Sequence, residues 1–224
     1  MATLETQTSP GYFRIALQSG LAAMLCLGLP AGLMFWLIFF QQTGNSAILS
    51  RMIDLLQYYG MLEIALYFLG AWMWGILLAR ISGYRPGWQV GVATLLGACI
   101  GRWSPLTHLD RWSQGHIPGA PVHVVFAIFL SGFIFSVTAC IGLMYGLILR
   151  NWKAAIILAL TTGISTVLIT LLMIFLMDQW GIRVGTGDAA MPKVTAVCTL
   201  ISALIGGIVL GIGFSRFVEK SRVK

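Results

Sequence analysis

The chain has 224 residues, of which 58% are hydrophobic and only 9% are charged, and it carries a formal net charge of +7. A typical soluble domain has roughly 25% charged residues, so the side chains that would cover a water-soluble surface are missing and a soluble fold is excluded. The mean hydropathy of +0.88 agrees, as do the 26 glycines, because glycine is commoner in membrane helices than in soluble ones. We therefore predict an integral membrane protein in contact with the lipid bilayer.

Six apolar segments follow one another along the chain. A transmembrane helix needs roughly 20 apolar residues to cross about 30 Å of hydrocarbon, and all but the segment between Arg85 and Arg102 meet that length. The predicted spans are about 15–40, 58–79, 86–101, 122–149, 154–177 and 194–215. The sequence thus predicts an all-α fold, a bundle of six transmembrane helices forming a single membrane domain over residues 1–224.

The segment 46–59, directly before the second span, has an amphipathic pattern. If it is helical, its two faces differ in polarity: Ile48, Leu49, Met52, Ile53 and Leu56 against Ser50, Arg51, Asp54 and Gln57. A short helix with such faces favours the plane of the membrane surface, so we predict an interfacial helix here.

The basic residues divide unequally between the two ends of the predicted bundle. With six spans, nine of the fourteen lysines and arginines fall on the side of both termini and five on the other, whereas omitting 86–101 gives seven on each side. Cytoplasmic loops carry the excess of basic residues, so we predict a multi-pass protein of the inner cell membrane with both termini cytoplasmic. The basic C-terminal tail is expected to attract anionic lipid headgroups and not nucleic acid, which binds a basic surface of a folded, water-facing domain.

Four of the spans contain a G-x-x-x-G pair. Such pairs allow helix backbones to approach closely in lipid. The pairs are Gly28/Gly32, Gly97/Gly101, Gly142/Gly146 and Gly207/Gly211. They predict packing within this chain or, alternatively, docking of another membrane subunit.

Threonines form a continuous stripe on the fifth span. Thr162, Thr166 and Thr170 are spaced by four residues, and Thr195, Thr199 and Ser202 match them on the sixth span. One interpretation is hydrogen bonding between the two helices. The other is a polar lining for a small-solute site that includes Thr162, Thr166 and Thr170.

Glu63 is the acidic residue that lies well inside an apolar span. A carboxylate at membrane depth costs at least about 2.5 kcal/mol on insertion scales, and such residues mark functional sites. Tyr67 and Trp74 share its helical face. We therefore predict that Glu63, Tyr67 and Trp74 bind a ligand, with a structural, protonated carboxyl as the alternative for Glu63.

All three histidines, His108, His116 and His123, fall within sixteen residues of one another, together with Asp110. Imidazole and carboxylate groups bind zinc and other divalent ions, so a metal or haem site is one hypothesis for this external loop. A pH-sensitive loop and ordinary polar roles are the others. The sequence identifies no cofactor.

Catalytic motifs are scarce. The chain has no G-x-S-x-G, H-E-x-x-H or phosphate-binding loop. The sequence Gly185-Thr186-Gly187-Asp188 resembles the G-x-G-D segment of intramembrane aspartyl peptidases such as prepilin peptidases. That chemistry needs a second carboxylate sharing a proton with the first, and no second motif is present, so we interpret the segment as a polar turn and favour a protein that is not an enzyme.

These features together predict a non-enzymatic membrane protein that binds or transports a small solute as one subunit of a larger membrane assembly. Small six-span substrate-binding subunits of vitamin importers are similar in size and topology, an analogy at the level of fold alone. The alternatives are an accessory subunit of a membrane complex with no ligand of its own, and a metal- or haem-binding membrane protein that uses His108, His116 and His123.

Overall fold

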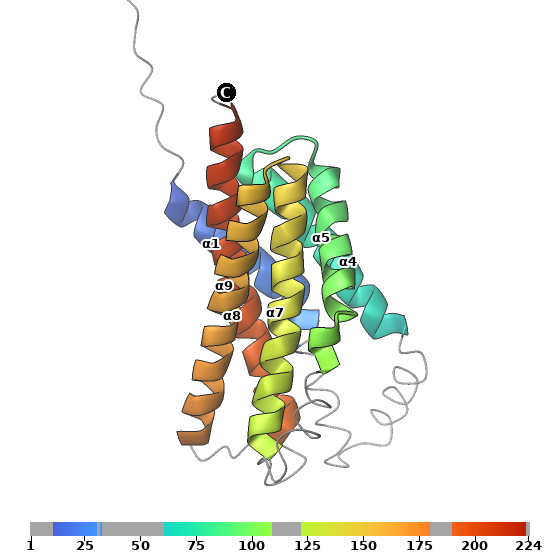
Figure 1. The fold of residues 1–224 in the computed structure, drawn as a ribbon, viewed down its shortest axis with the longest axis vertical. Helices are drawn as coiled ribbons and strands as arrows, with labels where there is room; N and C mark the ends of the chain where they lie inside the picture. The colour runs from blue at the N-terminus through green and yellow to red at the C-terminus, as the bar shows by residue number, and fades with distance from the viewer. Residues whose placement is uncertain (1–10, 31, 33–60, 109–121, 180–189, 223–224) are drawn as a thin grey trace, which may run out of the picture.

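The computed structural model describes residues 11–30, 32, 61–108, 122–179 and 190–222. Within these ranges the chain is helical and has no strand (Figure 1). The helices are α1 (Tyr12–Ala23), continued by the π-helical turn η1 (Met24–Gly28), α4 (Met61–Ser82), α5 (Gly87–Arg102), α7 (Val122–Ile148), α8 (Trp152–Gln179) and α9 (Ala190–Arg222), with a short 3-10 turn η2 (Pro105–His108). The predicted all-α class is confirmed.

Four helices are long and apolar enough to cross a membrane, which indicates a membrane protein. The candidate spans are Ala65–Ser82, Ala127–Ile148, Trp152–Met177 and Val194–Ser221, and each overlaps a predicted span. The segment 86–101 is helical, as α5, but has only 16 residues, and the apolar part of the first helix, Tyr12–Gly28, is also short. A six-span topology therefore stays a prediction. The predicted interfacial helix at 46–59 lies outside the described residues. The part of the first predicted span that follows residue 30 also lies outside them, apart from residue 32.

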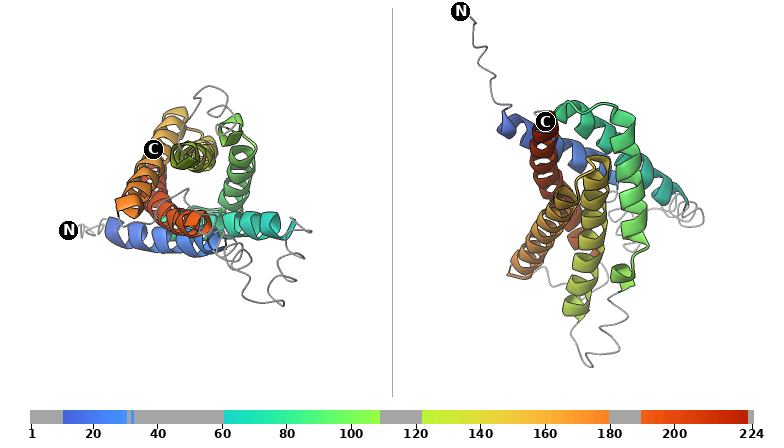
Figure 2. Two further views of the ribbon diagram at one scale, coloured as in Figure 1. Left: turned by 90° about the horizontal axis from the view of Figure 1, so that it is seen from below. Right: turned by 45° about the horizontal axis from the view of Figure 1, so that its top comes forward.

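The helices form a closed ring. In order around it, α1 packs on α4, α4 on α5, α5 on α7, α7 on α8, α8 on α9 and α9 back on α1. Figure 2 shows this arrangement from below, with α1 and α4 strongly inclined relative to α7 and α8. Successive helices thus enclose a common interior, and this interior holds the candidate site.

Short connections make α7 and α8 antiparallel neighbours. The turn places Arg150 at a positive φ of 50°, and the Asn151 backbone N–H donates to the Gly146 carbonyl at 3.0 Å. The Asn151 side-chain oxygen then accepts a hydrogen bond from the Ala154 N–H at 3.1 Å. This contact satisfies one of the N–H groups that the first turn of α8 leaves without a partner.

Glycines set the closest contacts between helices of the chain. A Cβ added at Gly97 would lie 2.6 Å from the Ile141 Cα of α7, and one at Gly142 would lie 2.7 Å from the Ala159 N of α8. On the other side of the ring, a Cβ at Gly207 would lie 2.5 Å from the Ala23 Cβ of α1. Real Cβ atoms do not make such contacts, so glycine at these positions permits the observed spacing of the helices.

Candidate solute-binding cavity

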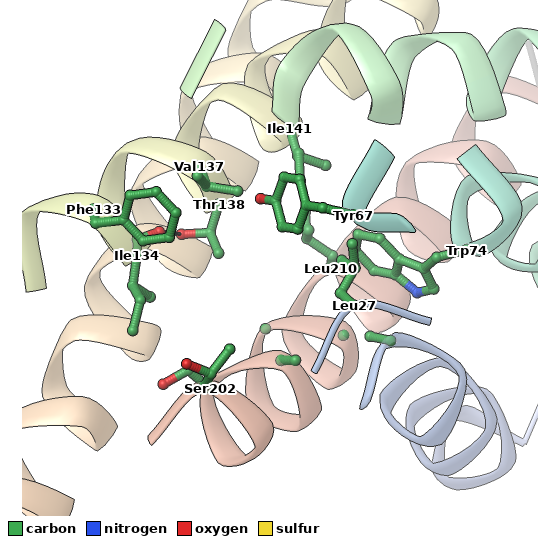
Figure 3. A pocket seen from close by; sticks show the side chains of 15 residues that line it. Leu27, Tyr67, Trp74, Phe133, Ile134, Val137, Thr138, Ile141, Ser202 and Leu210 are labelled. Carbon is green, nitrogen blue, oxygen red and sulfur yellow. Dashed lines mark hydrogen bonds between the residues drawn. The ribbon is translucent and has the colours of Figure 1, made fainter. Parts of the chain in front are cut away.

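A cavity of about 70 Å³ lies inside the ring, between α1, η1, α4, α7 and α9 (Figure 3). Its walls are almost entirely carbon, with aromatic rings from α4 and α7 and small residues from α9. The lining residues are Ala23, Leu27, Tyr67, Trp74, Phe133, Ile134, Val137, Thr138, Ile141, Thr199, Ser202, Ala203, Gly206, Gly207 and Leu210. A water molecule needs roughly 10–15 Å³ of such space, so the cavity has room for a few waters or one small solute.

Two aromatic residues of α4 form one wall. Tyr67 and Trp74, both predicted as ligand-binding residues, line the cavity. The Tyr67 hydroxyl points from α4 toward Val137 and Thr138 of α7 (Figure 3). Trp74 is 1% exposed, and its indole nitrogen has no hydrogen-bond partner within the described part of the chain. Trp74 therefore gives the cavity wall a buried indole ring whose N–H has no acceptor among the described residues.

The π-helical turn η1 brings Leu27 to the same cavity. Pro30 has no N–H and so leaves the Cys26 carbonyl, four residues earlier, without its usual helical donor. That carbonyl lies directly against α4, where a Cβ at Gly70 would collide with it. π-Helical turns are rare and frequently occur at functional sites. Here the turn and the glycine together bring the first helix close to the aromatic wall.

The opposite wall carries hydroxyl groups that are already hydrogen-bonded. The Thr138 hydroxyl donates to the Ile134 carbonyl at 2.8 Å and lies 3.1 Å from the Thr166 hydroxyl of α8. The Ser202 hydroxyl of α9 lies 2.8 Å from that of Thr170. Since these groups are engaged with neighbouring helices, the cavity presents mainly apolar surface.

The predicted threonine stripe lies behind this wall. Thr162, Thr166 and Thr170 are fully buried but are not among the residues that line the cavity. Thr166 and Thr170 connect α8 to α7 and α9 through the hydrogen bonds above, while the Thr162 hydroxyl has no partner among the described residues. The stripe therefore supports the wall, and of the matching hydroxyl residues on α9 it is Thr199 and Ser202 that line the cavity.

The sequence did not single out the contribution of α7. Phe133, Val137 and Thr138 line the cavity but lie in a helix that is apolar on every face. The signal that could have found them is the hydroxyl of Thr138, since hydroxyl groups in membrane helices commonly bond across helix interfaces.

Glu63 is described only by its backbone, which lies in α4. It precedes Tyr67 by four residues, a spacing that places two residues on one helical face about 5–6 Å apart. The guanidinium carbon of Arg102, at the end of α5, lies 5.9 Å from the centre of the Tyr67 ring, close enough for a cation–π interaction. A basic side chain from α5 thus packs next to the helical face on which Glu63 is located.

The histidine hypothesis falls mostly outside the described residues. His108 belongs to η2 and His123 to α7, but their side chains are not described and neither is any part of His116. Among the residues that the structure does describe, no three His, Cys, Asp or Glu side chains are grouped so that they could hold a metal. The metal site stays a hypothesis.

One end of the bundle is strongly basic. The start of α1, the turn between α4 and α5, the turn between α7 and α8 and the end of α9 lie at this end (Figure 1). The exposed basic side chains of these segments are Arg14, Arg80, Arg85, Arg150, Lys153, Arg216 and Lys220. Here Tyr12 joins α1 to α9, because its hydroxyl donates to Glu219 at 2.7 Å and the Arg216 guanidinium lies 5.2 Å from its ring centre. Trp88 and Trp152, 60% and 65% exposed, begin α5 and α8 at this end, where amphipathic rings favour the headgroup level.

Comparison with known proteins yields no relative: no family model, curated protein or solved structure matches the chain.

Proposed function

We propose that this protein is a non-enzymatic, multi-pass membrane protein that binds a small, largely apolar solute in the cavity at the centre of its helix ring. The observation that supports the proposal is the cavity itself, to which four separate parts of the chain contribute: the first helix, α4, α7 and α9. Ligand sites in proteins are concave and mostly apolar, with a few polar groups that fix orientation. The Tyr67 hydroxyl and the Trp74 N–H supply those groups here.

The nature of the walls narrows the class of solute. A buried N–H without an acceptor costs roughly 1–3 kcal/mol, so an acceptor atom on the solute, or a water bound with it, stabilises Trp74. The hydroxyls of Thr138 and Ser202 are already paired and contribute little polarity. We infer a compact solute with one or two polar atoms on an apolar body.

We extend the proposal to topology and partners. The basic end faces the cytoplasm, all six helices cross the inner membrane, and Arg216 and Lys220 contact anionic headgroups next to the C-terminal tail. The excess of basic side chains at one end supports this orientation. The exposed Trp88 and Trp152 support a position of this end at the headgroup level of the membrane. The protein then acts as a solute-binding or transport subunit of a larger membrane assembly. Native mass spectrometry of the purified protein tests this proposal, because an assembly would contain partner chains in a fixed ratio to this chain.

Filling the cavity tests the binding proposal. Ala203→Phe places a ring at the cavity wall, and Ala65→Phe is the matched control, because Ala65 is exposed on the outside of α4. Small molecules that co-purify with the protein in nanodiscs are extracted and quantified by mass spectrometry. We expect a compound retained by the wild type and by Ala65→Phe and lost from Ala203→Phe. If no compound distinguishes a folded Ala203→Phe protein from the control, the solute-binding function is wrong.

A further inference from the structure

A second hollow lies on the outside of the ring, in the groove between α7 and α8. Its volume is about 580 Å³, and it is lined by α7 from Val124 to Phe135, by α8 from Val167 to Ile174, and by Leu106 after α5. Ser131 is the one polar side chain among these lining residues. The groove therefore offers almost nothing to hold a polar ligand.

Helix packing explains why the groove forms at this end. Near the connecting turn, Gly142 and Gly146 of α7 lie against Ala159 and Ala155 of α8, so the two helices are in close contact there. Toward the other end they separate (Figure 1). The Phe135 ring packs on Gly163, where an added Cβ would lie 2.7 Å from its Cε2, and it closes the inner end of the groove.

The groove has the depth of one lipid leaflet. From Val124 to Phe135 the helix rises about 16 Å at 1.5 Å per residue, and half of a hydrocarbon core of about 30 Å is about 15 Å. Leu106 and Val124 mark its outer end, at the end of the bundle where Trp103, 67% exposed, follows α5 at headgroup level. Most of its lining lies within the candidate spans Ala127–Ile148 and Trp152–Met177.

We propose that this groove binds one acyl chain of a phospholipid from the leaflet opposite the basic end. Hydrocarbon is the solvent at this depth, and a crevice left empty would forfeit the dispersion contacts of its walls. Length, position and apolar lining all fit an extended lipid tail whose headgroup stays at the level of Trp103. The site is separate from the central cavity and does not depend on the solute-binding function.

Photolabelling from the bilayer tests this site. The full chain is reconstituted into dioleoylphosphatidylcholine vesicles that contain a phosphatidylcholine with a diazirine at the middle of one acyl chain, and labelled positions are mapped by mass spectrometry. We expect several-fold more labelling of the groove segments 124–135 and 167–174 than of the exposed face of α8 around Ile157, Leu160 and Ile164. Those three residues are 48%, 49% and 51% exposed to the same bilayer.

Filling the groove supplies the control. Ala127→Phe should lower groove labelling several-fold, to the level of the exposed face, while Ala65→Phe leaves it unchanged. Val167→Phe fills the groove from α8 and takes the place of Ala127→Phe if that protein does not fold. Equal labelling of the groove and the exposed face, or labelling that survives both filling variants, would overturn the proposal. If the lipid does not label the groove and crosslinks form between two copies of the chain instead, the groove is a protein interface and the proposal is wrong.

Discussion

The contact between α5 and α7 permits a quantitative prediction for Gly97→Ala. The added Cβ would lie 2.6 Å from the Ile141 Cα and 2.8 Å from its N, whereas ordinary contacts begin near 3.4 Å. Both neighbouring atoms belong to the backbone, so relief requires α5 and α7 to separate by about 0.8 Å. A gap of that size forfeits a quarter to a half of each dispersion contact along the seam. We expect the free energy of unfolding to fall by about 1–3 kcal/mol, the usual cost of overpacking.

Gly87→Ala is the control for this effect, because it introduces the same methyl group near the start of the same helix. There the nearest atom to the new Cβ is the Ala79 Cβ at 3.4 Å, an ordinary contact. Alanine is intrinsically favoured over glycine in a helix, so this variant should be neutral or slightly more stable. Unfolding in mixed detergent micelles, followed by circular dichroism, measures both. If Gly97→Ala is as stable as Gly87→Ala, glycine does not set the distance between these helices.

Two further predictions concern hydrogen bonding and topology. Thr170→Val removes the 2.8 Å hydrogen bond to Ser202 and should lower the free energy of unfolding by about 0.6–1.7 kcal/mol. Thr161→Val is the control, because the Thr161 hydroxyl bonds only within α8, and it should change the free energy of unfolding less. Equal effects of the two variants would contradict a stabilising role for the interhelical bond. In a background with its four cysteines replaced by alanine, Asn151→Cys should react with a membrane-impermeant maleimide in inverted vesicles. Pro105→Cys, at an exposed position next to the groove, should react with it in intact cells. Labelling of both from one side would refute the proposed topology.

Hydropathy located the helices well and their ends less well. The predicted span 122–149 corresponds to α7 at Val122–Ile148, but the predicted 194–215 corresponds to the longer helix Ala190–Arg222. Apolar counting stops at the charges that begin with Arg216, while the backbone hydrogen bonds of the helix continue through them. The length of the apolar segment therefore measures the part of a helix that suits hydrocarbon, and not the whole helix.

Of the two aromatic walls of the candidate cavity, only the one formed by α4 could be predicted from the sequence. Tyr67 and Trp74, which line the cavity, were predicted as site residues because they share a helical face with Glu63, whereas Phe133 and Val137 were not predicted. In a soluble protein the apolar face of a helix identifies its interior side, but in lipid the outer face is as apolar as the core. For α7, then, side-chain chemistry does not distinguish the residues that line the cavity from those that face the bilayer.

Glycines at neighbouring positions of α9 face different helices, although both line the cavity, and the glycine pattern alone does not show where a hollow lies. Gly207 is in close contact with α1, where the Ser19 hydroxyl donates to its carbonyl at 2.7 Å. Gly206, one residue earlier, lines the cavity, and the atom nearest to a Cβ placed there is the Thr166 Cγ2 at 3.1 Å. At both positions the absent side chain permits close packing, with α1 at Gly207 and with α8 at Gly206. The hydrogen bond between Thr138 and Thr166 then joins α7 to α8 behind the point where Thr138 lines the cavity, so the predicted threonine stripe supports the cavity wall.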